Sequence, residues 1–282
     1  MVSLLAESPA LFVSLALVIG LLVGSFLNVV ILRLPPVLEH LWKKEYAEFT
    51  EIEFDEAAPP SVAWSRSHCP QCKNQLSAWH NIPVISYLLL RGRCHFCAQK
   101  ISVRYPLIEL ISGVGAAWLA HQMGFGWPVM AALLLLWWLL AITFIDLDTY
   151  LIPDQLSLTL LWLGLLFSLF SFSITPADAI IGALVGYLSL WTVFQLFLLF
   201  TGKEGMGYGD FKLLAAGGAW LGAEMLIAVL LIASVSGLVV ALIQMALKKG
   251  GQKIPFGPYL SVGIMVSYLY GTEVMQLLFP GF

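Results

Sequence analysis

Long apolar runs dominate the chain, and short breaks containing proline, glycine or charged residues separate them. Most of these runs are close to the ~20 residues that a helix needs to cross a bilayer. A membrane β-barrel would instead show short segments of alternating apolar and polar residues. The pattern predicts an all-α polytopic membrane protein with about eight transmembrane helices, over residues 10–32, 106–122, 127–145, 153–172, 177–200, 211–222, 224–247 and 258–279.

Composition agrees with a bilayer protein. Of the 282 residues, 60% are hydrophobic and 11% are charged, whereas a soluble domain is about a quarter charged. The first apolar run has no Lys or Arg before it and no small-residue cleavage site after it, so it is predicted to be a retained span rather than a signal peptide. A formal net charge of -3 gives no basic face, which excludes nucleic acid as a partner.

The distribution of basic residues predicts the orientation. With the N-terminus outside, threading eight spans places all 14 Lys and Arg on one side of the membrane. Cytoplasmic loops carry such an excess. Both termini are therefore expected on the side of the membrane away from the cytoplasm. Nine basic residues lie in the first loop, from Arg33 to Arg104, and the others are Lys203, Lys212, Lys248, Lys249 and Lys253.

Small residues recur at four-residue spacing within three of the runs. Such spacing lets two helices approach closely. The pairs are Gly20 with Gly24, Gly182 with Gly186, and Gly218 with Gly222. They predict tight helix packing and give no information about activity.

A polar insert at 34–105 divides the chain into a first span at 1–33, a small cytoplasmic domain, and a membrane domain at 106–282. The insert carries two C-x2-C pairs, Cys69 with Cys72 and Cys94 with Cys97. Two such turns complete a tetrahedral S4 zinc site, as in a zinc ribbon. All four positions are then filled by protein, so the metal is structural.

Two further features of the insert leave alternatives open. Disulfides are disfavoured because cytoplasmic thiols stay reduced. His68 and His95 adjoin the cysteines and could replace one as a ligand, although a surface role fits better when four thiols are available.

An acidic run before the cysteines is either a solvated linker or a negatively charged collar that attracts a cationic peptide. It comprises Glu45, Glu48, Glu51, Glu53, Asp55 and Glu56.

Acidic residues within the apolar part are candidates for function, because ionised groups at bilayer depth are costly. Glu109, Glu224 and Glu273 lie near span ends and are expected to be solvated. Asp178 suits the first turn of the fifth span, where the helix dipole favours an acid. The remaining acids lie in two loops that the topology brings to the cytoplasmic face.

The first of these loops contains Asp146, Asp148 and Asp154 and has no Lys or Arg, so its carboxylates have no local counter-ion. Pro153 suits the first turn of the fourth span and makes Asp154 a helix-start acid. Asp148 is predicted to point to water. Of the three acids, Asp146 is predicted to lie deepest in the membrane. It is therefore the acid whose position is hardest to explain without a function.

The second loop reads Gly205-Met206-Gly207-Tyr208-Gly209-Asp210. Its alternating glycines permit close backbone approach and bring Asp210 to the head of the sixth span. A glycine-rich turn before a helix could instead cradle phosphate. No Walker lysine-serine pair follows, and an aspartate there would repel phosphate, so nucleotide binding is disfavoured.

Two carboxylates that meet at the edge of the hydrocarbon cannot both ionise easily and are expected to share one proton. An ionised and a protonated aspartate together suit aspartic proteolysis, in which one activates water and the other polarises the scissile carbonyl. No serine motif or H-E-x-x-H signature offers another hydrolytic centre. A proton-relay transporter and a zinc-ribbon scaffold are the alternative classes.

The order of motifs along the chain resembles that of the type IV prepilin peptidases. The matching motifs are Gly24-Ser25-Phe26-Leu27-Asn28-Val29-Val30, the two cysteine pairs with Asn81-Ile82-Pro83 between them, Arg104-Tyr105-Pro106, the segment 146–154, the stretch from Gly202 to Lys212, and Pro255-Phe256-Gly257-Pro258. The resemblance implies a GxGD-type aspartic protease of the bacterial inner membrane. By the same resemblance, its catalytic acids are Asp146 and Asp210.

The resemblance also implies substrates and a second activity. Such an enzyme removes the cationic leader of type IV prepilins and type II secretion pseudopilins after a glycine at the cytoplasmic face. It then methylates the new N-terminal amine with S-adenosylmethionine. No Rossmann fingerprint is present, so the residues that bind the methyl donor stay unassigned, and the cytoplasmic domain is the expected place for them. The sequence does not indicate the oligomeric state.

Overall fold

The computed structural model describes residues 5, 7–62, 67–69, 71–170, 174–247 and 254–279. Within those residues the regular elements are helices, accompanied by two isolated β-bridges. The chain forms two compact units, Met1–Trp137 and Trp138–Phe282. The boundary between them falls inside α5 (Trp127–Thr149).

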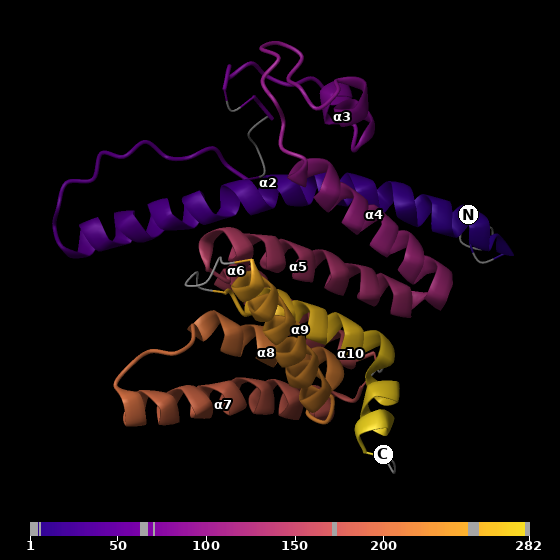
Figure 1. Ribbon diagram of the computed structural model, residues 1–282, viewed down its shortest axis with the longest axis vertical. Coiled ribbons are helices and arrows are strands. Elements are labelled where there is room, and N and C mark those ends of the chain that lie inside the picture. The colour runs from indigo at the N-terminus through magenta and orange to yellow at the C-terminus, as the bar shows by residue number, and fades with distance from the viewer. Residues whose placement is uncertain are drawn as a thin grey trace. The chain divides into compact units, whose positions relative to one another are not determined.

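The first unit is built on α2 (Pro9–Phe49) and α4 (Arg104–Met123). These two helices pack against each other along the apolar part of α2 (Figure 1). A Cβ added at Gly20 would lie 2.7 Å from the Ala116 Cβ, and one added at Gly24 would lie 2.8 Å from the Glu109 Cα. The predicted packing role of Gly20 and Gly24 is confirmed.

Helix α2 extends well beyond the end predicted from hydropathy. The apolar run stops at Leu32, but the helix continues through Pro35 and Pro36 to Phe49, inside the insert that we expected to begin at residue 34. After the two prolines the extension contains several good helix formers, Leu, Glu, Lys and Ala, and two exposed ion pairs at four-residue spacing support it. Hydropathy alone does not report a helix that leaves the membrane and continues in water.

The acidic run is therefore divided between two kinds of structure. Glu45 and Glu48 lie on α2, while the residues after Glu51 lie outside any helix. Lys43 pairs with Glu39 at 3.2 Å and with Glu56 at 3.4 Å. The prediction of a solvated linker over 45–56 is therefore wrong for Glu45 and Glu48, which lie on a helix.

The insert contains two short helices, the 3-10 helix η1 (Ala78–Asn81) and α3 (Ile85–Leu89). Two antiparallel bridges, His68 with Gln75 and Arg93 with Lys100, close the turns that carry the cysteines. The insert is therefore organised by turns rather than by a core of its own.

The second unit contains α6 (Asp154–Ser168), α7 (Pro176–Thr201), α8 (Tyr208–Leu221), α9 (Leu226–Ala246) and α10 (Gly257–Leu278). Helix α8 lies at its centre, in contact with α6, α7 and α10 (Figure 1). Its residues from Asp210 to Trp220 are buried, with the exception of Lys212. Gly182 and Gly186 of α7 lie directly against the α8 backbone, because an added Cβ would come within 2.6 Å of its carbonyl oxygens. This close packing brings α7 onto α8, as the glycine spacing predicts.

Each predicted apolar run contains a helix, which confirms a helical membrane protein. Four of the helices in the described part of the chain, α2, α5, α7 and α9, are long and apolar enough to cross a bilayer. Helix α8 has 14 residues, which makes it ~20 Å long and shorter than the ~30 Å hydrocarbon core. Eight complete spans therefore stay a prediction. Lys248, Lys249 and Lys253, which helped to orient the chain, lie outside the described residues.

Candidate active site and metal centre

Two aspartates are buried at the ends of helices in the second unit. Asp146 lies in the last turn of α5 and is 4% exposed, and Asp210 lies in the first turn of α8 and is 9% exposed. Asp148 is exposed, as predicted. The turn after Asp146 lies against the residue before Asp210, because a Cβ added at Gly209 would lie 2.8 Å from the Ile152 Cβ. The structure thus brings together the two acids that sequence analysis singled out.

The head of α10 completes the surroundings of Asp146. Its first residue, Gly257, donates a backbone N–H to the Asp146 Oδ2 at 3.0 Å. The first amides of a helix have no partner within it, so a carboxylate there satisfies one of them. A Cβ at Gly257 would lie 2.5 Å from the same oxygen. Only a residue without a side chain permits this contact.

Gly257 is a site residue to which sequence reasoning gave no role. Its motif, Pro255 to Pro258, was recognised without a function. The available signal was a glycine before Pro258 at the start of an apolar run, which marks a helix N-terminus. The contact spans 111 residues, so no local pattern could have connected it to Asp146.

Ile152 joins the three segments of the site. A Cβ added at Gly209 would lie 2.8 Å from the Ile152 Cβ, and one added at Gly257 would lie 2.9 Å from the Ile152 Cδ1. The glycine-rich loop and the head of α10 therefore both approach the turn that follows Asp146. The predicted need for close backbone approach in the Asp210 loop is met at Gly209.

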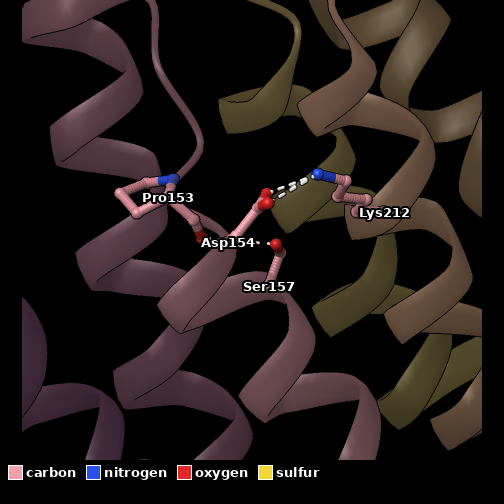
Figure 2. A network of polar contacts seen from close by, with 4 residues as sticks. All are labelled: Pro153, Asp154, Ser157 and Lys212. Atoms are coloured by element: carbon pink, nitrogen blue, oxygen red, sulfur yellow. Dashed lines mark hydrogen bonds and ion pairs between the residues drawn. The ribbon is translucent and has the colours of Figure 1, made fainter. Parts of the chain in front are cut away.

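One expectation about the Asp146 loop is wrong. Lys212 Nζ binds both carboxylate oxygens of Asp154, at 2.6 and 2.7 Å (Figure 2). The loop itself carries no base, but Lys212 comes from the first turns of α8, 58 residues further along. Counting the charges within the loop could not reveal a counter-ion that comes from a distant segment.

The start of α6 agrees with the sequence in part. Asp154 is the first residue of α6 and Pro153 immediately precedes it, one position earlier than predicted. Ser157 Oγ donates to the Pro153 carbonyl at 3.2 Å (Figure 2). Asp178 lies in the first turn of α7, where its amide donates to the Thr175 side chain, as a helix-start acid should.

Glu109 differs from its predicted environment. We expected a solvated residue near a span end, but Glu109 is 8% exposed. Its Oε2 accepts a hydrogen bond from the Val84 backbone N–H at 2.8 Å. The insert folds back over the start of α4, so this position is covered by protein. Glu224 and Glu273 are exposed, as predicted.

The four cysteines of the first unit form one cluster. The Sγ atoms of Cys69, Cys72, Cys94 and Cys97 all lie within 4.8 Å of one another, and none is in a disulfide. The Sγ atoms of Cys69 and Cys97 are 3.8 Å apart. Four thiolates at ~2.3 Å from a tetrahedral zinc would be separated by about the same distance. The cluster therefore fits a metal ion.

Both halves of the cluster are built in the same way. The Lys73 amide donates to the Cys69 carbonyl at 3.0 Å, and the Ala98 amide donates to the Cys94 carbonyl at 3.0 Å. Lys73 and Ala98 have nearly equal positive φ values, 57° and 56°. The repeated turn presents two thiols on one side, which is the geometry expected of paired metal-binding knuckles.

The pKa values of two thiols in the cluster shift in opposite directions, and burial together with hydrogen bonds from the neighbouring thiols raises the pKa of Cys97 to about 11. A hydrogen bond from the Cys72 backbone lowers the pKa of Cys69 to about 6, although burial opposes the shift. A thiolate is the form that binds metal. His95 stacks on His80, with ring centroids 4.9 Å apart, and the cluster is formed by the four sulfurs.

The fold and the site together define a helical membrane protein with a pair of buried aspartates and a separate four-cysteine cluster. Residues 18–123 match the profile of the Bacterial Peptidase A24 N-terminal domain, and residues 133–242 match that of the Type IV leader peptidase family. The chain belongs to the type IV leader peptidase family, and the resemblance seen in the motifs is confirmed.

Similar proteins cover almost the whole chain. The chain is 49% identical to the prepilin leader peptidase/N-methyltransferase of Stutzerimonas stutzeri over 97% of its own length and 96% of the relative. It is 46% identical to the protein of the same name from Pseudomonas aeruginosa over 99% of its own length and 98% of the relative. No solved structure matches it significantly.

Proposed function

We propose that this protein is an intramembrane aspartic endopeptidase that removes the leader peptide from type IV prepilins and type II secretion pseudopilins and then methylates the new N-terminal residue. Family membership and relatives named prepilin leader peptidase/N-methyltransferase support both activities. The observation that carries the peptidase activity is the placement of two buried aspartates around one turn. Asp146 accepts the Gly257 amide, and Ile152 lies against both Gly257 and Gly209, the residue before Asp210.

In the proposed mechanism the two aspartates have different protonation states. The Gly257 N–H stabilises the carboxylate form of Asp146, because a hydrogen bond to the charged form favours that form. Asp146 then accepts a proton from the attacking water, while protonated Asp210 donates a hydrogen bond to the scissile carbonyl oxygen. Water oxygen adds to the carbonyl carbon, the C–N bond breaks, and the proton taken by Asp146 passes to the departing amine.

The position of the pair fits cleavage at the membrane surface. Asp146 ends a helix that is long and apolar enough to cross the bilayer, and Asp210 begins α8. Both therefore lie at helix ends rather than at a midplane, and Lys212, one of the cytoplasmic basic residues, is two positions beyond Asp210. This placement favours proteolysis over a proton pathway, which would need acids along the span.

The cysteine cluster is assigned a structural role. Cys69, Cys72, Cys94 and Cys97 would hold one zinc ion with all four positions filled by sulfur, which leaves no position for a catalytic water. The ion would connect two turns of an insert that has little regular structure.

S-adenosylmethionine is the proposed methyl donor, from the name of the relatives. A Rossmann-type strand-turn-helix does not occur among the described residues, whose regular elements are helices. No group of side chains there identifies a donor site, so no methylation step is assigned to particular residues.

The membrane arrangement that we propose has eight spans in the bacterial inner membrane and both termini in the periplasm. The first span is at 1–33, the cytoplasmic zinc domain at 34–105, and the protease domain at 106–282. It is supported by the correspondence between apolar runs and helices and by the one-sided distribution of basic residues. Prepilins, pseudopilins and the lipid bilayer are the proposed partners.

The proposal is tested by incubating the purified protein with a prepilin peptide that carries its leader. We expect cleavage at the leader junction, followed by transfer of a methyl group from S-adenosylmethionine to the new amine. Cleavage without methylation would contradict the second activity alone. Proton transport by reconstituted protein with no cleavage would instead support the transporter class.

A further inference from the structure

The register between α2 and α4 sets the depth of the insert in the membrane. Gly24 faces the backbone of Glu109, and the Asn28 Nδ2 donates to the Tyr105 carbonyl at 3.1 Å. Arg33 is the first charged residue after the apolar run of α2. At 1.5 Å per residue, Asn28 lies ~7 Å and Gly24 lies ~13 Å on the membrane side of Arg33. The first turns of α4 are therefore already at membrane depth.

Glu109 links α3 to the first turns of α4, which lie at this depth. Its buried carboxylate accepts the Val84 N–H at 2.8 Å, and Val84 is the residue immediately before α3. Val84 has φ 61°, a costly conformation for a β-branched residue that persists only where the surroundings impose it. Helix α3 therefore begins beside the first turns of α4.

Large apolar side chains are exposed on α3 and on η1. Leu88 is 67% exposed and Leu89 is 78% exposed, although α3 has only five residues. Ile85 is 55% exposed, and Trp79 on η1 is 78% exposed. At bilayer depth these side chains would contact lipid rather than water, and Trp is enriched at that interface.

The stretch of sequence that contains α3 carries basic residues and no acidic ones. The sequence has no Asp or Glu between Glu56 and Glu109. It has six basic residues there, Arg66, Lys73, Arg91, Arg93, Lys100 and Arg104. Arg91 and Arg93 directly follow α3 and are exposed. Basic side chains beside an apolar segment are complementary to the anionic phospholipids of a cytoplasmic leaflet.

We propose that α3 is an interfacial membrane anchor. Leu88, Leu89 and Trp79 insert into the cytoplasmic leaflet beside α2 and α4, and Arg91 and Arg93 bind the phosphate groups of anionic phospholipids. The anchor holds the cysteine-bearing turns against the membrane surface. It acts independently of the proposed peptidase activity, since it involves neither buried aspartate.

The test uses the full-length protein in nanodiscs that contain phosphatidylglycerol. A photoreactive benzoyl-phenylalanine replaces Leu89 in one variant and Glu53, an exposed residue of the same insert, in the control. We expect roughly tenfold more phospholipid adduct at position 89 than at position 53. Equal adduct yields at the two positions would overturn the proposal.

A second comparison separates lipid binding from an acidic protein partner. With the photoreactive group at position 89, Arg91→Gln combined with Arg93→Gln should lower the adduct with phosphatidylglycerol several-fold, whereas Lys73→Gln should not. Adducts at position 89 with a protein instead of lipid, in inner-membrane vesicles, would overturn the anchor. Because neither readout requires cleavage, the outcome is distinct from any failure of the proposed peptidase activity.

Discussion

At the scale of single residues, Gly257 contacts Asp146 so closely that no side chain fits between them. Its amide is bonded to Asp146, and a methyl group on its Cα would meet the same carboxylate oxygen at 2.5 Å. The hydrogen bond requires the Gly257 amide close to Asp146, and the steric limit requires the absence of a side chain there. Both arise because the head of α10 approaches Asp146 with its backbone.

We expect Gly257→Ala to lower kcat by about tenfold or more with little change in KM, because displacing Asp146 misorients the attacking water. Peptide cleavage kinetics in detergent measure both constants. Gly237→Ala is the matched control, since its Cβ would meet Tyr259 at 3.3 Å and no acid. Equal losses in the two variants would show that helix packing, rather than the Asp146 contact, is responsible.

The Asp154–Lys212 ion pair should matter far less than the buried pair. The Asp154 side chain is 52% exposed, and exposed ion pairs contribute at most ~1 kcal/mol. Asp154→Asn should therefore leave cleavage within a few-fold of wild type, as should Asp148→Asn. A loss as large as that of a buried aspartate would show that Lys212 positions α8 through this pair.

At the scale of elements, the cysteine turns offer a direct test of the metal. Metal analysis should find about one zinc per chain. Cys69→Ser or Cys94→Ser should lower the zinc content and expose the insert to proteolysis, because the ion connects the two turns. Ser67→Ala is the control. Disulfides in freshly purified protein, with no metal, would contradict both the zinc site and the cytoplasmic placement.

The acidic stretch that follows α2 has a separate prediction. Neutralising Glu51, Glu53, Asp55 and Glu56 together should raise KM for a cationic leader peptide at low salt. The effect should shrink as salt rises, because exposed charges are screened over ~8 Å at physiological ionic strength. An unchanged KM at low salt would leave this stretch as a linker.

The sequence predicts a feature of the structure only where hydropathy or a local motif marks that feature. Apolar runs predicted the membrane helices, because burial in lipid requires them to be apolar throughout. The extension of α2 to Phe49 was missed, since a helix in water shows no hydropathy signal. Asp146, Asp210 and the cysteines were found because each lies in a local motif. Gly257, Lys212 and the Glu109 contact with Val84 depend on pairings between distant segments, which no local pattern contains.

At the scale of the whole molecule, two kinds of chemistry belong to two different parts of the chain. The buried aspartates lie in the second unit, and the cysteine cluster lies in the first. If methylation uses a site other than the aspartates, variants that cannot cleave should still methylate a precleaved peptide with a free N-terminus. Loss of both activities in one aspartate variant would indicate a shared site.

The central claim is that Asp146 and Asp210 act as one catalytic unit. Asn is nearly isosteric with Asp but cannot exchange the proton, so Asp146→Asn and Asp210→Asn should each abolish cleavage while zinc content stays normal. The double variant should be little worse than either single one, as is usual for coupled catalytic groups.

The most direct measurement is the cleavage rate of a prepilin peptide by these three variants, with Asp148→Asn as the exposed control. The account predicts no detectable cleavage in the three and near wild-type cleavage in the control. Substantial cleavage by Asp210→Asn would contradict the aspartic-protease mechanism, and an active Asp146→Asn beside an inactive Asp148→Asn would show that Asp148 is the catalytic acid.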